Sequence, residues 1–382
     1  MGVFMADDVL LNKAASIERC VRRAREEYER DPASFADIVK AAAQGDFGQR
    51  LATAGKTGFF ATLAGNMNQL LQTSEQGLTD VADVLAAFAE GDLTQQATVT
   101  ATETLSASTQ TRLVTDGAIV TAKQLNLTAH DLSNVGGTVQ QSGTGNTTIT
   151  LAGSLDNAGG KVAVNSNQLN LSAQSLNNNA GTIAGNGSLS ITVATDTTHT
   201  GSMLANKDLS FTTTANLTNS GKLQAGQSLT VSATTLDNTA TGELSSTATT
   251  LNATSSFTNR GLVDGGNTAG TGSTRIQAAT VHNLGTGRIY GDKLGIAATT
   301  LNNDAETINS ITKTATIAAR ARLDIGATTI NNSQGSNILS VGDMAIGGSL
   351  DSNGQATGRA DTVNNSASTI ESFGAMRITA AT

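Results

Sequence analysis

The chain has 382 residues and a formal net charge of -8, and charged residues make up only 14% of its composition, against about 25% in typical soluble domains. This acidic balance excludes the basic stripe that nucleic-acid binding requires, and the single cysteine, Cys20, excludes an intrachain disulfide. No stretch reaches 18 apolar residues, which excludes a helical membrane span. The opening MGVFMADDVL lacks a basic region followed by an apolar run, so we expect no signal peptide there.

Residues 1–35 are predicted to form an amphipathic helix. Apolar side chains recur every three or four residues between Leu10 and Tyr28, which places them on one helix face. Pro32 is expected to break or cap this helix. The stretch resembles the first helix of HEPN-type ribonuclease toxins. That family uses an arginine followed closely by a histidine, whereas the first histidine here is His130, so the resemblance carries over no catalytic residue.

Residues 36–96 are also predicted to be helical, with an apolar seam at 4-3 spacing from Phe60 to Phe88. This spacing is typical of a coiled coil, and an ordinary helical hairpin is the alternative. The motif ADIVKAAAQGDFGQR, from Ala36, returns as ADVLAAFAEGDLTQQ, from Ala82. On these motifs the segment resembles a tandem HAMP segment of methyl-accepting chemotaxis proteins. The resemblance implies parallel helices that join two chains into a homodimer.

Residues 112–382 form a long repeat, and residues 97–111 are predicted to be a linker before it. A Leu-x-Asn step returns about every 20 residues, and apolar and polar residues alternate within each period. This alternation predicts short strands. Three strands per period make one turn of a β-solenoid, and each of about eleven turns buries its apolar face only against its neighbours. The last two intervals are longer than one period and predict insertions.

The asparagine of each step has a physical role in such a solenoid. Asparagine tolerates the left-handed backbone of a corner, and an inward amide can also hydrogen-bond to the next turn along the axis. A turn residue on the surface is the alternative. His199 is expected to replace asparagine in one turn. The predicted structural ladder comprises Asn134, Asn157, Asn178, Asn219, Asn238, Asn259, Asn283, Asn303, Asn332 and Asn365.

The repeat pattern, seen in LTNSGKLQAGQSLTVSA and LNNNAGTIAGNGSLSITVA, resembles the hemagglutinin repeats of filamentous hemagglutinins and contact-dependent inhibition exoproteins. The resemblance implies a right-handed β-helix, secretion by a two-partner route, and a surface rod that adheres or carries a toxin. The predicted fold class is therefore mainly β, a right-handed parallel β-helix preceded by an α-helical region. Three partial resemblances in one chain suggest a rearranged, chimeric gene.

No catalytic, cofactor-binding or metal-binding residue is predicted. His130, His199 and His282 fall in different turns, whereas a metal site needs ligands that converge. Gly55-Lys56-Thr57 is similar to the end of a phosphate-binding loop, but Arg50 stands where that motif needs its first glycine. We therefore expect a protein that is not an enzyme and uses no cofactor.

The expected function is structural and adhesive: a β-helical rod fragment of a surface exoprotein, whose partner is a receptor on a host or neighbouring cell. The alternative is a signalling fragment in which the HAMP-like helices dimerise and the repeats are passengers. The resemblance implies the cell surface or secretion. Because no signal peptide or secretion domain is recognised in the sequence, retention in the cytoplasm is the alternative. Neither a nucleic-acid partner nor a membrane span is expected.

Overall fold

The computed structural model describes residues 18–19, 22, 32–53, 61–62, 64–76 and 98–382. The chain divides into two compact units, Met1–Ala87 and Phe88–Thr382, and each is described here by itself. The expected first helix, residues 7–35, lies almost entirely outside the described residues. Among the described residues, no helix is both long and apolar enough to cross a membrane.

The first unit contains helix α2 (Pro32–Ala43) and a second helical stretch over residues 64–76. Proline suits the first position of a helix because its missing N–H would have no partner there. The helix ends before Gly45, whose φ of 90° is accessible to glycine. Asn68, in the second helical stretch, binds the backbone of Leu51, which lies between the two stretches. The Leu51 N–H donates to Asn68 Oδ1 over 2.7 Å, and Asn68 Nδ2 donates to the Leu51 carbonyl over 2.9 Å.

A small apolar cluster holds this unit together. Ile38, Leu51, Ala64 and Leu71 are buried in it, and Met67 packs against them. Ala64, Met67 and Leu71 belong to the predicted apolar seam, so the described part of the seam packs within one chain, as the hairpin alternative requires. The coiled-coil alternative needs a second chain and stays a prediction. Phe60 and the seam residues from Leu78 to Phe88 lie outside the described residues.

The second unit is built almost entirely of β-strands, and their bounds follow in chain order. The first half comprises β1 (Thr98–Ser108), β2 (Arg112–Val114), β3 (Ile119–Ala129), β4 (Asp131–Ser133), β5 (Thr138–Gln141), β6 (Thr147–Leu151), β7 (Ser154–Asp156), β8 (Lys161–Val164), β9 (Gln168–Ala173), β10 (Ser175–Asn177), β11 (Thr182–Gly185), β12 (Ser188–Val193), β13 (Thr197–His199), β14 (Ser202–Ala205), β15 (Asp208–Thr213), β16 (Asn216–Asn219) and β17 (Lys222–Ala225). The second half comprises β18 (Ser228–Asn238), β19 (Glu243–Ser245), β20 (Ala248–Asn259), β21 (Leu262–Gly265), β22 (Ser273–Gln277), β23 (Thr280–Leu284), β24 (Arg288–Asp304), β25 (Glu306–Ile308), β26 (Ile311–Lys313), β27 (Thr316–Ser333), β28 (Asn337–Ser340), β29 (Asp343–Gly347), β30 (Ser349–Leu350), β31 (Ala356–Thr357), β32 (Thr362–Ser366), β33 (Thr369–Ser372) and β34 (Met376–Ile378).

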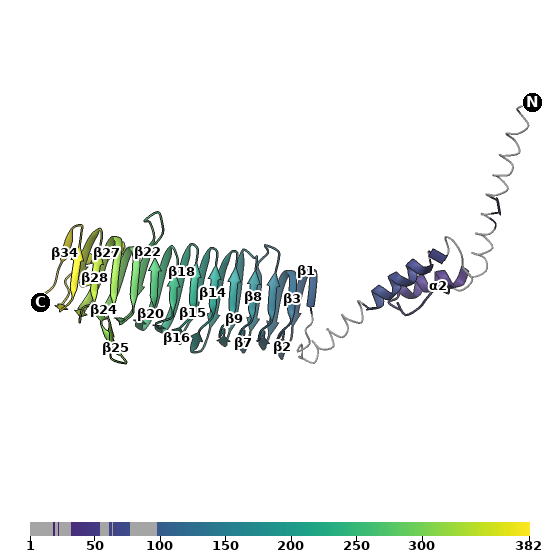
Figure 1. Ribbon diagram of the computed structural model, residues 1–382, viewed down its shortest axis with the longest axis horizontal. Helices are drawn as coiled ribbons and strands as arrows, with labels where there is room; N and C mark the ends of the chain where they lie inside the picture. The colour runs from purple at the N-terminus through teal and green to yellow at the C-terminus, as the bar shows by residue number, and fades with distance from the viewer. Residues whose placement is uncertain (1–17, 20–21, 23–31, 54–60, 63, 77–97) are drawn as a thin grey trace, which may run out of the picture. The chain divides into compact units, whose positions relative to one another are not determined.

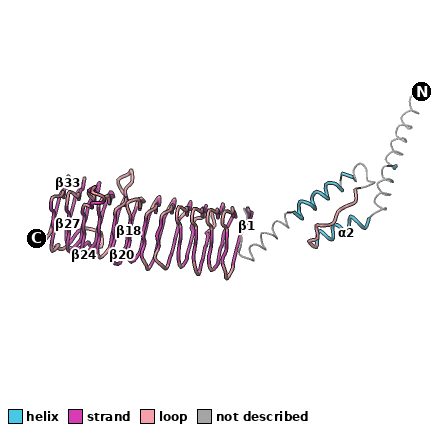
Figure 2. The backbone as a smooth tube through the Cα atoms, turned by 60° about the horizontal axis from the view of Figure 1, so that its bottom comes forward, coloured by secondary structure: helices cyan, strands magenta, loops and turns pink. Residues whose placement is uncertain are grey.

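These strands coil into a parallel β-solenoid of about 12 turns with a spacing of about 21 residues, which confirms the predicted fold class. One turn runs through β16, β17 and the first part of β18, and each strand pairs in parallel with its counterpart one turn away. The strands therefore lie side by side along the solenoid, with loops at its corners (Figures 1 and 2). The right-handed sense of the coil stays a prediction.

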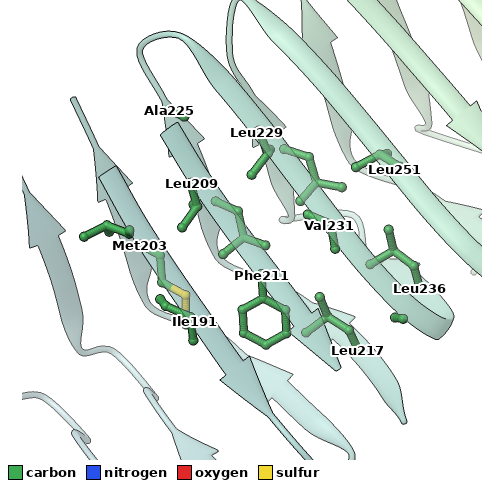
Figure 3. Packing of buried hydrophobic residues seen from close by; sticks show 14 of the residues in the cluster. Ile191, Met203, Leu209, Phe211, Leu217, Ala225, Leu229, Val231, Leu236 and Leu251 are labelled. Atoms are coloured by element: carbon green, nitrogen blue, oxygen red, sulfur yellow. The ribbon is translucent and has the colours of Figure 1, made fainter. Parts of the chain in front are cut away.

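A single apolar column fills the solenoid. Burial alternates along each strand, as in β15, where Leu209, Phe211 and Thr213 point inward. Residues in register on neighbouring turns stack on one another along the solenoid, so Phe211 lies opposite Val231. Figure 3 shows Ile191 and Phe211 within this column. The side chains inside each turn pack against those of the turns on either side, so the core is narrow but continuous along the solenoid.

The solenoid begins earlier than predicted. Residues 98–108 were expected to be linker, but they form β1, which pairs in parallel with β3 from Thr98 opposite Ile119 to Ser108 opposite Thr128. Four of its apolar side chains, those of Val99, Ala101, Leu105 and Ala107, pack against the core. The expectation failed because no Leu-x-Asn step precedes this strand, and alternation of alanine with threonine or serine is a weak signal by itself.

Three insertions leave the coil without breaking it, as the long intervals predicted for two of them. The hairpin β25–β26 projects from one side (Figure 1). The hairpin β30–β31 follows β29 in the chain. A loop over residues 266–272 joins β21 to β22. The strands resume their register after each insertion, since Asn303 lies opposite Asn332 and Asn332 opposite Asn365.

Candidate functional site

The ten predicted ladder asparagines lie at equivalent corners of successive turns. Nine are at most 1% exposed, whereas Asn365 in the last turn is exposed. The amide Nδ2 of each donates to Oδ1 of the next over 2.7–2.9 Å in two runs. The first run is Asn134, Asn157 and Asn178; the second is Asn219, Asn238, Asn259, Asn283, Asn303, Asn332 and Asn365.

The same amides also bind the backbone, and this explains the glycine that follows most of the steps. Asn157 Nδ2 donates to the Gly160 and Thr182 carbonyls, each over 3.3 Å. A Cβ on Gly160 would lie 1.9 Å from the Asn134 carbonyl oxygen and 2.7 Å from Asn157 Oδ1. The chain passes so close to the asparagine stack that no side chain fits there. The asparagines thus link each turn to the next at this corner by hydrogen bonds between their amides and to the backbone.

His199 interrupts the ladder between the two runs. It lies opposite Asn219 in register, as predicted. Its Nε2 contacts the Lys222 carbonyl over 3.2 Å, the equivalent of one asparagine contact. Its Nδ1 and the Oδ1 of Asn219 are both buried and without a hydrogen-bond partner. Burial lowers the pKa of His199 to about 4, although the Lys222 carbonyl opposes the shift.

Thr115 begins the ladder, and the sequence analysis missed it. Its hydroxyl donates to Asn134 Oδ1 over 2.8 Å and lies within 3.1 Å of the Ser133 carbonyl. Threonine occupies the asparagine position one turn earlier, so a search for asparagine could not find it. The signal that could have found it is Leu113, two residues before, at the spacing of the Leu-x-Asn step.

The histidines do not meet one another. His130 Nδ1 lies 2.8 Å from Asp131 Oδ2, and His282 Nδ1 lies 3.1 Å from Asn302 Nδ2. Hydrogen bonds from the Ser154 N–H and hydroxyl, then from His130, lower the pKa of Asp131 to about 2. The Ser154 hydroxyl donates to the Asp131 carboxylate. In a nucleophilic triad the serine hydroxyl donates to the histidine instead, so these three residues do not form one. Within the described residues, no three His, Cys, Asp or Glu side chains gather as metal ligands.

Buried carboxylates fix the insertions onto the coil. Asp292 Oδ2 accepts the N–H groups of Asn267 and Gly272 over 2.9 and 2.8 Å, and Oδ1 binds Arg320 over 2.8 Å. Burial alone would raise the pKa of Asp292, but these hydrogen bonds outweigh it and the pKa lies below its ordinary value. The loop over residues 266–272 is held in place by this carboxylate.

The two hairpins are held in the same way. The Arg260 guanidinium binds the carboxylate of Glu306, at the base of β25–β26, over 2.8–3.1 Å. This bond, more than the opposing burial, holds the pKa of Glu306 below its usual range. Asp324 Oδ1 accepts the Ala356 N–H of β30–β31 over 2.9 Å, and the carboxylate also binds Arg322.

Comparison with known proteins relates the chain to two groups. The haemagglutinin repeat family matches residues 39–159 and 144–221. Toxin CdiA of Yersinia pestis is 44% identical over 107 residues, which are 28% of this chain and 3% of that protein. Methyl-accepting chemotaxis protein McpB of Pseudomonas aeruginosa is 47% identical over 72 residues, 19% of this chain and 11% of that protein. The chain thus spans a small part of either relative's length.

No solved structure matches the chain. The family match ends at residue 221, but Asn219 pairs with Asn238, and the same corner continues to Asn365. The strand repeats of this chain therefore resemble the haemagglutinin repeats of filamentous hemagglutinins and contact-dependent inhibition exoproteins, and the family match itself covers residues 39–221.

Proposed function

We propose that the solenoid is a rigid spacer and display segment of an adhesin-type surface exoprotein. The observation that carries this proposal is the continuous parallel pairing of about 12 turns, which buried asparagines link at one corner. With neighbouring strands about 4.8 Å apart, these turns span roughly 60 Å. Such a column resists bending, because a bend would separate layers of a close-packed core. In this role the chain is structural and not an enzyme.

The adhesive part of the proposal rests on the haemagglutinin repeat match and on the similarity to toxin CdiA. The proposed partner is a receptor on a host cell or a neighbouring bacterium, and the proposed location is the cell surface after two-partner secretion. The outward residues of the strands are mostly threonine, serine, asparagine and glutamine. They present a neutral polar surface that suits hydrogen-bonded recognition more than apolar docking.

Attachment of coated beads tests this function. Beads carrying the full chain are added to cultured epithelial cells and to Gram-negative bacteria, and attached beads are counted. The matched control is Leu217→Asp, which places a charge in the column where Leu217 is 1% exposed and disrupts the turns around it. The proposal expects several-fold more attachment by the unchanged chain to one cell type. Equal attachment by both proteins on both cell types would end the adhesive proposal.

A second candidate function has support from the similarity to McpB. In this proposal, the helical unit pairs two chains through HAMP-like helices and retains a signalling role. Sedimentation equilibrium of the full chain tests it. Met67 lies on the expected seam and packs in the apolar cluster, whereas Leu70 is 61% exposed. A dimer that Leu70→Glu retains, and that Met67→Glu abolishes while its far-ultraviolet circular dichroism keeps the helical signal, would support pairing through the seam. A monomer at all concentrations would exclude it.

A further inference from the structure

A hollow on the outer face of the solenoid collects basic side chains in an otherwise acidic chain. It lies between the face formed by β20, β22, β24 and β27 and the tip of the hairpin β30–β31, and its volume is about 380 Å³. We call it the basic groove, and its argument rests on Thr250, Ser273, Arg275, Lys293, Arg322 and Asp324. We propose that the basic groove binds the oxyanion group, carboxylate or phosphate, of an acidic ligand.

The register of the strands places these side chains. Thr250, Arg275, Gly295 and Asp324 lie opposite one another on four successive strands. Two residues earlier along the strands, Ser273, Lys293 and Arg322 form a second row. Inward residues alternate with these, so both rows face outward from the coil. The sequence spacing hides this arrangement, because the residues come from four different turns.

The hairpin β30–β31 supplies a fixed wall. It lies directly on the outer face, since a Cβ on Gly326 would be 2.2 Å from the Ser349 carbonyl carbon. Asp324 is 4% exposed although it points outward, because the hairpin covers it and donates the Ala356 N–H to it. The Arg275 guanidinium lies against the hairpin tip, because a Cβ added to Gly354 would be 3.3 Å from Arg275 Nη1. The groove is therefore preformed, which lowers the cost of binding.

The charges in the basic groove are not balanced. Arg322 donates from Nε and Nη2 to Asp324 over 2.6 and 3.0 Å, so this pair is neutral overall. Arg275 and Lys293 remain, and across the described range 98–382 neither side chain has an ion pair or hydrogen bond. Lys293 also lies directly opposite Arg322, and like charges in that position repel. An anion in the groove would relieve this repulsion.

The donors suit an oxyanion in particular. A guanidinium offers a planar fork that matches two oxygens, and an ammonium adds a compact positive charge. The hydroxyls of Thr250 and Ser273 line the same groove and can donate to further oxygens. Gly295 has no side chain between Arg275 and Asp324, which leaves room for the ligand. A neutral ligand would gain little from these two cations.

Calorimetric titration of the full chain at low ionic strength tests the proposal, with inorganic phosphate, glucuronate and glucose as separate probes. Phosphate or glucuronate is expected to saturate one site, whereas glucose is expected not to bind. Tighter binding of glucuronate would point to an acidic group on a larger molecule, and tighter binding of phosphate to the free ion or a phosphate ester. Either order supports an oxyanion site.

A matched pair of variants locates the site. Arg275→Gln with Lys293→Gln removes both unpaired cations, and we expect it to weaken binding about tenfold or more. Arg288→Gln with Lys207→Gln changes the net charge equally at two exposed positions outside the groove, and binding should stay within about twofold. Equal weakening by both double variants, or no saturable binding of either oxyanion to the unchanged chain, would overturn the proposal.

Discussion

Replacing His199 by asparagine should repair the ladder and stabilise the turns beside it. In the unchanged chain, His199 Nδ1 and Asn219 Oδ1 are buried without partners, and each unpaired buried group costs about 1–3 kcal/mol. An asparagine at position 199 would donate to Asn219 Oδ1, as Asn238 donates to Asn259, and could accept from Asn178. It would leave part of the imidazole space empty, at a cost of about 1 kcal/mol.

The expected net effect of His199→Asn is a stabilisation of at least about 1 kcal/mol. Long repeat arrays unfold in parts, so one global free energy of unfolding is not well defined. Amide hydrogen exchange in β13 and β16 measures the effect locally, and protection should rise by about one order of magnitude. The reverse variant Asn259→His opens a second break and should lower protection in β20 and β23. Unchanged protection in both variants would refute the stabilising role of the ladder.

Three further predictions concern other parts of the solenoid. The folded state resists protonation of His199, because burial lowers its pKa from 6.5 to about 4. The contribution of this group to the free energy of unfolding is therefore complete above pH 6.5 and falls by about 3 kcal/mol as the pH drops to about 4. Amide exchange measured against pH should show this loss of stability in the unchanged chain and not in His199→Asn. Gly160→Ala should lower the local stability that amide exchange reports in β8 by more than about 3 kcal/mol, because its Cβ would overlap the Asn134 carbonyl. Gly65→Ala, with open space around it, should be neutral or slightly stabilising for the helix that contains it. Asp292→Ala should speed proteolytic cleavage within residues 266–272 while the far-ultraviolet spectrum stays unchanged, since that carboxylate holds two backbone N–H groups of the loop; unchanged cleavage would show that the loop is held otherwise.

The sequence allowed much of the coil to be predicted because each turn repeats one local pattern. The Leu-x-Asn step, the alternation of apolar residues and the following glycine all act between neighbouring turns, so their spacing is visible in one dimension. His199 was placed correctly at an asparagine position for this reason. The strand β1 was missed because alanine and threonine alternate there without a step, and packing against β3 decides its structure.

The contacts outside the core could not be predicted from spacing. Asp292 meets Arg320 after 28 residues, and Asp324 meets the Ala356 N–H after 32. These sequence separations depend on where the insertions fold back, which no periodic pattern encodes. The basic groove has the same origin, since Arg275 and Lys293 approach each other only through the register of β22 and β24. The resemblance of residues 7–35 to ribonuclease toxins lies almost wholly outside the described residues and stays a prediction.

One distance tests the stacked register most directly. Thr218, Asp237, Thr258, His282, Asn302 and Asn331 lie opposite one another on successive turns. Spin labels at Thr218→Cys and Asn331→Cys, in a Cys20→Ser background, are thus five strand spacings apart, or about 24 Å at 4.8 Å each. Double electron–electron resonance should give a narrow distribution near that distance. A broad distribution near 60 Å, roughly what a flexible chain of this length would give, would contradict the solenoid.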